Sequence, residues 1–77
     1  MDISDIMVIT TEYITLGQLL KFAGLAYSGG DIKAILANSE IFVNGEAENR
    51  RGKKLYAGDI IKIDDNDEII IKNDNEA

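Results

Sequence analysis

The run Ile41-Phe42-Val43-Asn44-Gly45 constrains the fold of this chain more than any other part of the sequence. A short run of β-branched and aromatic residues ends there at Asn-Gly, the dipeptide that most favours a tight hairpin turn with positive φ. The sequence therefore predicts a strand at 41–43 and a short return strand at 46–48. The next segment, 49–54, is predicted to form a loop, and it contains four of the chain's eight basic residues.

A strand and a first helix are predicted before this hairpin. The residues from Ile6 to Ile14 are rich in β-branched and aromatic types, which favours a strand of about five residues at the start of this run. Thr15 and Gln18 have the spacing of a capping box, in which two side chains accept hydrogen bonds from free backbone N–H groups at a helix start. An apolar stripe with the helical period follows, and Gly24 favours a stop, so we expect a helix at 16–23.

A second helix follows after a short connection. Ser28, with Asp31 three residues later, predicts its N-cap, and the pattern favours an end near Asn38. Gly29 and Gly30 fall in its first turn, where they are compatible with helix entry or with close approach of a ligand. The Lys-Ser/Thr of a phosphate-binding P-loop is missing, which favours helix entry.

The C-terminal part predicts two more strands. A turn at 57–59 precedes a strand at 60–63, a polar turn at 64–67 precedes a strand at 68–72, and residues 73–77 are expected to fray. The fold class is therefore α+β, with two short helices, at nearly right angles or antiparallel, packed on one face of a small, mostly antiparallel sheet. We expect these residues to form the core: Leu16, Leu19, Leu20, Ile32, Ile35, Leu36, Val43, Leu55, Ile61 and Ile63.

Composition narrows the function classes. The 77 residues predict a single domain spanning 1–77, and the absence of Cys and His removes disulfides, thiolate metal sites and the commonest acid–base catalyst. No apolar run approaches the roughly 20 residues of a membrane span, and the acidic N-terminus lacks the signal-peptide pattern, so we expect a cytoplasmic protein. The acids at 64–68 indicate a solvated turn, because a calcium loop needs a central glycine. We expect neither catalysis nor a metal or cofactor site.

The charge distribution draws attention to the loop at 49–54. The net charge is −6, but residues 1–14 carry −3, residues 15–58 carry +2 and residues 59–77 carry −5. The basic residues of the loop are Arg50, Arg51, Lys53 and Lys54. Guanidinium and ammonium groups suit phosphate contacts, so the loop is compatible with a nucleic-acid site and equally with a solvated surface.

Two lysines and two tyrosines are further candidates for such a site. Lys21 and Lys33 lie off the apolar stripes of their helices and would extend a basic patch if the helices lie beside the loop. Tyr27 and Tyr56 are compatible with stacking on bases, although packing at the edge of the core is favoured.

The order of these elements resembles the S4-like RNA-binding domain, whose defining unit is the αL motif. The residues that carry the likeness are a leucine-rich first helix from Leu16 to Lys21, a serine-capped helix from Ser28 to Leu36, Val43-Asn44-Gly45, and Gly58-Asp59-Ile60-Ile61. The likeness covers about residues 15–63, with 1–14 as an N-terminal strand and 64–77 as a C-terminal strand and acidic tail. The runs 10–18 and 48–55 make the chain most similar to compact stand-alone bacterial members of the YaaA type.

This resemblance implies a non-catalytic module that binds structured RNA, of the ribosomal or transfer RNA class, through phosphate contacts from the basic loop and the second helix. Residue by residue, it implies these RNA contacts: Lys33, Arg50, Arg51, Lys53, Lys54, Lys21 and Asn44. Many family members have an arginine directly after the capping serine, where this chain has Gly29, so one phosphate contact is missing.

Two rival interpretations use the same scaffold. One is a protein–protein interaction module or adaptor that docks a partner through its acidic ends. The other is a β-grasp sulfur carrier, which shares Val-Asn-Gly-Glu but needs a C-terminal Gly-Gly, whereas this sequence has Asp-Asn-Glu-Ala there. The oligomeric state is left open by the sequence.

Overall fold

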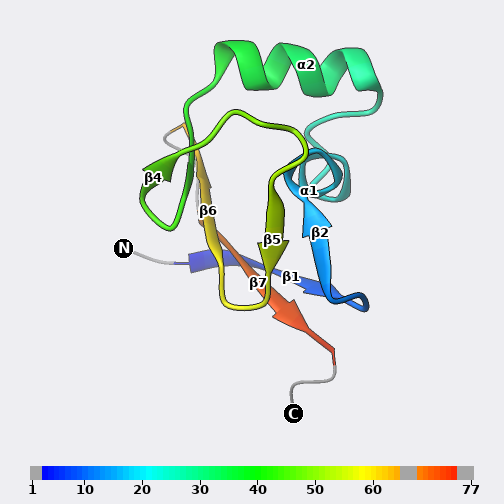
Figure 1. The fold of residues 1–77 in the computed structure, drawn as a ribbon, viewed down its shortest axis with the longest axis vertical. Helices are drawn as coiled ribbons and strands as arrows, with labels where there is room; N and C mark the ends of the chain where they lie inside the picture. The colour runs from blue at the N-terminus through cyan, green and yellow to red at the C-terminus, as the bar shows by residue number, and fades with distance from the viewer. Residues whose placement is uncertain (1–2, 65–67, 75–77) are drawn as a thin grey trace.

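The computed structural model describes residues 3–64 and 68–74, which form two helices, a five-stranded sheet and a two-stranded sheet (Figure 1). The elements are β1 (Ile3–Ile9), β2 (Tyr13–Thr15), α1 (Leu16–Phe22), α2 (Gly29–Asn38), β3 (Ile41–Val43), β4 (Glu46–Ala47), β5 (Lys54–Tyr56), β6 (Ile60–Ile63) and β7 (Glu68–Asn73). The larger sheet has the order β1-β7-β6-β3-β4, and β2 pairs with β5 in the smaller one. All pairings in the larger sheet are antiparallel except that of β1 with β7. The α+β class is confirmed.

The helix starts follow the sequence signals. At α1 the backbone N–H of Thr15 donates to Gln18 Oε1 at 2.9 Å, and that of Gln18 donates to Thr15 Oγ1 at 3.3 Å, which completes the capping box. At α2 the N–H of Asp31 donates to Ser28 Oγ at 3.2 Å. Figure 1 shows α1 nearly end-on and α2 from the side, so the helices cross steeply and are not antiparallel.

The N-terminal segment differs from its prediction of one strand. The structure has two strands there, because the chain bends at residues 10–12 and passes from the larger sheet to the smaller one. In the smaller sheet Ile14 pairs with Leu55 and Thr15 with Lys54, so Lys54 belongs to a strand and not to the loop. This pairing joins segments far apart in the sequence, and local patterns do not reveal it.

The C-terminal prediction is corrected at one residue. Asn73 was expected to fray but ends β7 in register with Ile9, and the N–H of Asp74 donates to the Ile9 carbonyl at 3.0 Å. Residues 65–67 of the expected polar turn and residues 75–77 lie outside the described residues.

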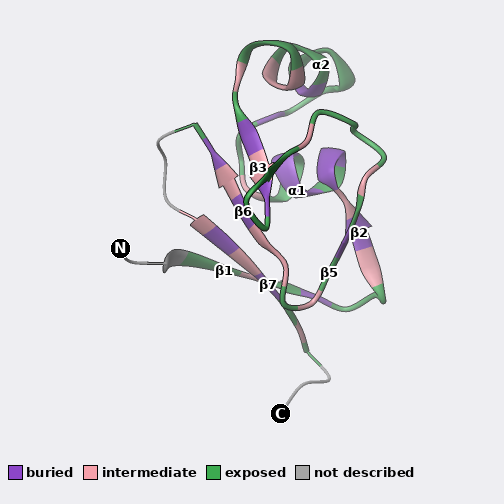
Figure 2. Cartoon of the chain, turned by 60° about the vertical axis from the view of Figure 1, so that its left-hand side comes forward, coloured by how far each residue is buried: buried purple, intermediate pink, exposed green. Residues whose placement is uncertain are grey.

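The core lies between the helices, the smaller sheet and the inner face of the larger sheet (Figure 2). Ile35 and Leu36 were expected inside but are only half-buried against it, and the other expected core residues are buried. The prediction missed these buried residues: Ile9, Ile14, Ala26, Ile41, Ile69 and Ile71. The inner faces of β1, β2 and β7 therefore contribute more apolar surface than the sequence indicated.

Candidate nucleic-acid interface

The loop between β4 and β5, residues 48–53, is bonded to the first turn of α1 (Figure 1). Leu16 N–H donates to the Lys53 carbonyl at 2.8 Å, and Gly17 N–H donates to the Arg51 carbonyl at 2.9 Å. The first N–H groups of any helix have no partner inside the helix, so the loop satisfies two of them. The backbone that bears Arg51 and Lys53 is thereby held in place, while the side chain of Arg51 is exposed.

Gly17 lies at this junction of the loop with α1. A Cβ atom at this position would lie 3.4 Å from the Arg51 carbonyl oxygen and 3.6 Å from Ile32 Cγ2 of α2. The glycine therefore marks the point where the loop, α1 and α2 converge. Sequence reasoning missed its role, although a glycine in the first turn of a helix was a signal.

Arg51 and Lys33 line one surface hollow, although they belong to the loop and to α2. The remaining lining residues of this hollow, of about 440 Å³, are Gly29, Leu36, Ala37 and Asn49. We call these six residues the loop–helix hollow. Its lining contains two cations and no acid.

A Cβ atom on Gly29 would meet no heavy atom within 4 Å. The position that holds arginine in many members of the family that the sequence resembles is therefore sterically open here. Its side chain would start from the wall of the loop–helix hollow. The glycine leaves this wall of the hollow without a charge, although a Cβ atom would fit there.

Arg50 is engaged by an acid of its own loop. Its Nε and Nη2 atoms donate to the Glu48 carboxylate at 2.9 and 3.1 Å, and its backbone N–H donates to the same group at 3.0 Å. The side-chain bonds from Arg50, followed by the backbone bond, lower the pKa of Glu48 to about 2, and the same pairing raises the pKa of Arg50 above its ordinary value. The Arg50 side chain is 71% exposed and the Glu48 side chain 12% exposed, so the pair stands at the surface with the guanidinium outward.

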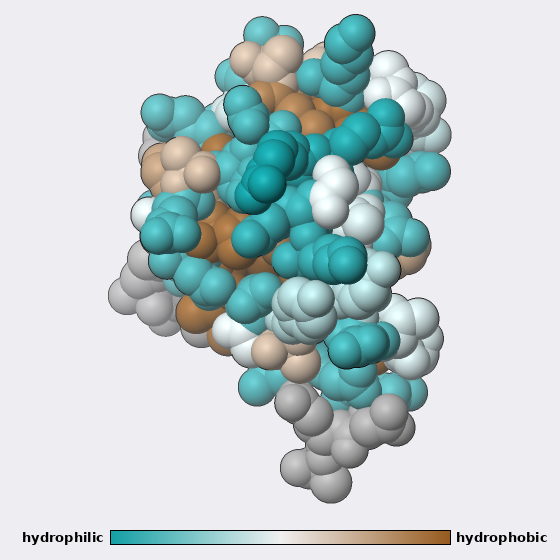
Figure 3. Space-filling view, viewed as in Figure 1, coloured by the Kyte–Doolittle hydropathy of each residue, from teal (hydrophilic) through white to brown (hydrophobic). Residues whose placement is uncertain are grey.

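Lys53 is the last residue of the loop, and Lys54 is the first residue of β5. Lys54 Nζ is 5.0 Å from the centre of the Tyr13 ring, and the Tyr13 and Tyr56 rings are 5.7 Å apart. A second hollow is lined by Arg50, Gly52, Lys53, Lys54 and Tyr56. Tyr56 is 43% exposed, so its ring is available at the edge of this hollow. Figure 3 shows strongly hydrophilic side chains gathered over this loop and beside α2.

Two of the predicted contact residues do not join these hollows. Asn44 is exposed, but its side-chain amide is already bonded within the chain: Nδ2 donates to Asp59 Oδ1 at 3.0 Å, and Oδ1 accepts from the Ile60 N–H at 3.0 Å. Its φ of 54° and that of Gly45, 87°, confirm the predicted turn. Lys21 is exposed in the last turn of α1, where a cation suits the helix dipole, and lines neither hollow.

The αL order of helices, hairpin and basic loop is thus present as one assembled unit. The chain belongs to the S4 domain family, whose model matches residues 7–72. A similar protein is the Bacillus subtilis (strain 168) protein named "Probable ribosome maturation protein RlbA". The two sequences are 54% identical over 56 residues, which cover 73% of this chain and 79% of the relative.

Two further observations concern the part of the chain that the structure describes. Neither of its helices is long and apolar enough to cross a membrane. Within residues 3–64 and 68–74, no group of three or more His, Cys, Asp or Glu side chains is placed to hold a metal ion.

Proposed function

We propose that this chain is a non-catalytic RNA-binding module that recognises structured RNA, of the ribosomal or transfer RNA class, through phosphate contacts. The observation that carries the proposal is the loop–helix hollow, in which Arg51 and Lys33 meet from separate elements. A guanidinium suits bidentate phosphate contact and an ammonium supplies a compact charge, so the pair is suited to a bent or folded RNA backbone.

The fixed backbone of the loop supports this assignment. Binding by a mobile loop loses conformational freedom, whereas this loop is already tied to α1 through the carbonyls of Arg51 and Lys53. Lys53, Lys54 and Tyr56 form a second contact area on the other side of the loop, with a ring for base stacking. Lys21 and Asn44 make at most marginal contributions, because one lies apart and the other is engaged within the fold.

The acidic net charge of −6 does not oppose local binding. Screening limits the reach of surface charges to about 8–10 Å at physiological salt, so Lys33 and Arg51 of the loop–helix hollow act most strongly on a phosphate at contact distance. The name of the Bacillus relative refers to ribosome maturation, which makes ribosomal RNA the first target to test. We further propose that the chain acts in the cytoplasm and catalyses no reaction.

A pair of charge-matched double variants tests the site. Lys33→Ala with Arg51→Ala removes two charges from the loop–helix hollow, and Lys62→Ala with Lys72→Ala removes two from β6 and β7. Affinity for RNA from purified ribosomal subunits, and for total transfer RNA, is measured by fluorescence anisotropy over a salt series. We expect the hollow variant to bind at least tenfold more weakly and its log–log salt slope to fall by about 1.4–1.8, since each lost phosphate contact contributes about 0.7–0.9.

The sheet variant should change affinity by less than threefold. Equal losses in the two variants would show that RNA responds to total charge and that the hollow is no site. A loss for ribosomal RNA alone would identify the target class, whereas parallel losses for both RNAs would indicate recognition of shape and backbone only.

A further inference from the structure

β1 forms one edge of the larger sheet and is open on its outer side. It pairs with β7, and no described strand pairs with its other side. Figure 2 shows most of β1 as exposed. A strand paired on one side presents unpaired N–H and C=O groups along its free edge, which can accept another strand. The opposite edge, β4, has only two residues and offers little room for such pairing.

Two of the exposed residues of β1 are large and apolar. Ile6 is 64% and Val8 59% exposed, and Ile6 lies beside Ile70 of β7 on the same face. Native edge strands are commonly protected by lysine, proline or short length. The seven residues of β1 include neither lysine nor proline, and Asp5 is the one charged residue among them. The edge of β1 is thus better suited to contact with another polypeptide than to exposure to water.

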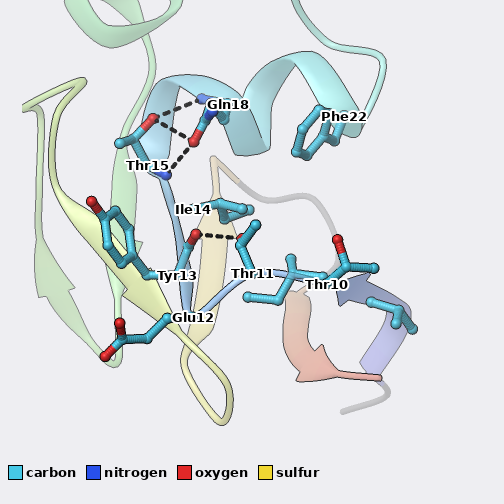
Figure 4. A pocket seen from close by; sticks show the side chains of 10 residues that line it. Thr10, Thr11, Glu12, Tyr13, Ile14, Thr15, Gln18 and Phe22 are labelled. Atoms are coloured by element: carbon cyan, nitrogen blue, oxygen red, sulfur yellow. Dashed lines mark hydrogen bonds between the residues drawn. The ribbon is translucent and has the colours of Figure 1, made fainter. Parts of the chain in front are cut away.

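A hollow continues this edge beyond the end of β1 (Figure 4). It has a volume of about 860 Å³ and is lined by Val8, Ile9, Thr10, Thr11, Glu12, Tyr13, Ile14, Thr15, Gln18 and Phe22. Phe22 is 63% exposed and extends from α1 over one side, while Glu12 and Tyr13 lie on the opposite side of the view. Apolar walls with hydroxyl groups and one carboxylate at the margin suit a long side chain with an apolar stem and a polar head.

The charges around β1 indicate the kind of partner. Residues 1–14 contain three acids and no basic residue. Asp74 lies next to the end of β1, because its N–H donates to the Ile9 carbonyl, and Lys72 opposite Val8 is the cation on the neighbouring strand. A second copy of this chain would bring the same acids and a further net charge of −6 to the interface. Charge complementarity therefore favours a basic partner over self-association.

We propose that the free edge of β1 and the adjoining hollow dock an extended, basic segment of a partner protein, which adds to the sheet as a sixth strand. The backbone edge supplies hydrogen bonds, Ile6 and Val8 contact alternate apolar side chains, and Asp5 and Glu12 attract the basic ones. In Figure 1 α2 lies at the top and β1 well below it, and the two hollows share no lining residue, so this contact leaves the loop–helix hollow free.

The test uses two acetylated and amidated nine-residue peptides, one alternating valine with lysine and one alternating valine with glutamate. Each is titrated into the full-length 15N-labelled chain, and amide shifts are followed by NMR. We expect the lysine peptide to shift the amides of β1 and of residues 10–12, to lose affinity with added salt, and to bind at least tenfold more tightly than the glutamate peptide.

Three variants locate the contact. Ile6→Asn with Val8→Asn keeps the net charge and should weaken lysine-peptide binding at least tenfold, while Asp5→Asn should weaken it about threefold. Leu25→Asn changes an apolar residue that is 43% exposed outside the sheet, and should bind as the parent does. The Ile6/Val8 variant should retain the parent's RNA affinity, so failure of this proposal is distinguishable from failure of the RNA site.

Three results would overturn the proposal. They are equal binding of the acidic peptide, shifts that map away from β1, and a concentration-dependent dimer in analytical ultracentrifugation whose β1 amides are protected from hydrogen exchange without peptide. The last result would make a second copy the occupant. Because Asp5→Asn and the peptide comparison leave the apolar surface unchanged, the outcome does not depend on the folding of the Ile6/Val8 variant.

Discussion

The end of the molecule that carries α2 and the basic loop differs from the end that carries β1 in how exposed groups are held. At the basic end, loop carbonyls accept hydrogen bonds from α1, and Glu48 holds Arg50. At the β1 end, the backbone edge is open and the exposed side chains are apolar or acidic. Exposed cations on a fixed backbone suit the phosphates of a nucleic acid. An unpaired strand edge suits the backbone of an extended peptide. The net charge of −6 averages over this division and describes neither end.

The largest effect should come from breaking the junction of the loop with α1. Gly17→Leu places a side chain against the Arg51 carbonyl and Ile32, and overpacking of this kind costs about 1–3 kcal/mol. Urea unfolding should show the loss, with a parallel loss of RNA affinity. Gly52→Leu is the control, because a Cβ atom at Gly52 meets nothing within 4 Å, and its stability should change by less than about 0.5 kcal/mol. Similar losses of stability in Gly17→Leu and Gly52→Leu would contradict the role given to Gly17.

A gain of affinity would sharpen the contrast between the ends. Gly29→Arg adds a cation at the wall of the loop–helix hollow, at a position where a Cβ atom meets nothing within 4 Å. We expect RNA affinity to rise about three- to tenfold and the salt slope to steepen by about 0.7–0.9, as for one added phosphate contact. Gly30→Arg carries the same charge on a residue that does not line the hollow, and should give a smaller gain. An equal gain from Gly30→Arg would mean that the hollow does not direct the contact.

The two arginines of the loop should contribute unequally. Arg51→Ala is expected to lower RNA affinity about three- to tenfold, because its guanidinium has no acid partner in the described structure. Arg50→Ala should lower affinity by less than threefold, because the Arg50 guanidinium already donates twice to Glu48. Anisotropy titrations of the single variants at one salt concentration make the comparison. A larger loss for Arg50→Ala would show that the pair opens to bind RNA.

The smallest expected effect is the loss of folding stability at low pH that results from protonation of Glu48. The pKa of Glu48 is about 2 in the folded chain against an ordinary 4.5, so its carboxylate stabilises the fold above pH 4.5 and this contribution is lost as the pH falls toward 2. An exposed ion pair contributes little, so we expect only a shallow effect. Urea midpoints measured from pH 6 to 2.5 should fall more for the parent than for Glu48→Gln. Identical pH profiles would show that the pair does not contribute to stability.

Local signals in the sequence predicted a large part of the fold. The capping pair Thr15 and Gln18, the N-cap Ser28 and the Asn44-Gly45 turn act within three or four residues, and each is present in the structure. The pairing of β2 with β5 and of β1 with β7 joins distant segments, and no local pattern specifies such a register.

The candidate site was predicted only as a set of charges. The sequence indicated Arg51 and Lys33 separately, but their shared hollow depends on the approach of the loop to α1 and α2 at Gly17. The pairing of Arg50 with Glu48 was missed, although the acid lies only two residues away in the sequence. The prediction that these side chains contact RNA remains a prediction.

The parallel pairing of β1 with β7 also sets an order for assembly. β1 is made first, and the strand that it pairs with is the last of the described strands, so the sheet cannot close until nearly all of these residues have been synthesised. Contacts between such distant segments slow folding, because a long loop must close before they form. The hairpin of β3 and β4 and the two capped helices can form earlier from neighbouring residues. On the ribosome, the nascent chain would therefore carry the apolar residues of β1 without their partner strand until β7 emerges.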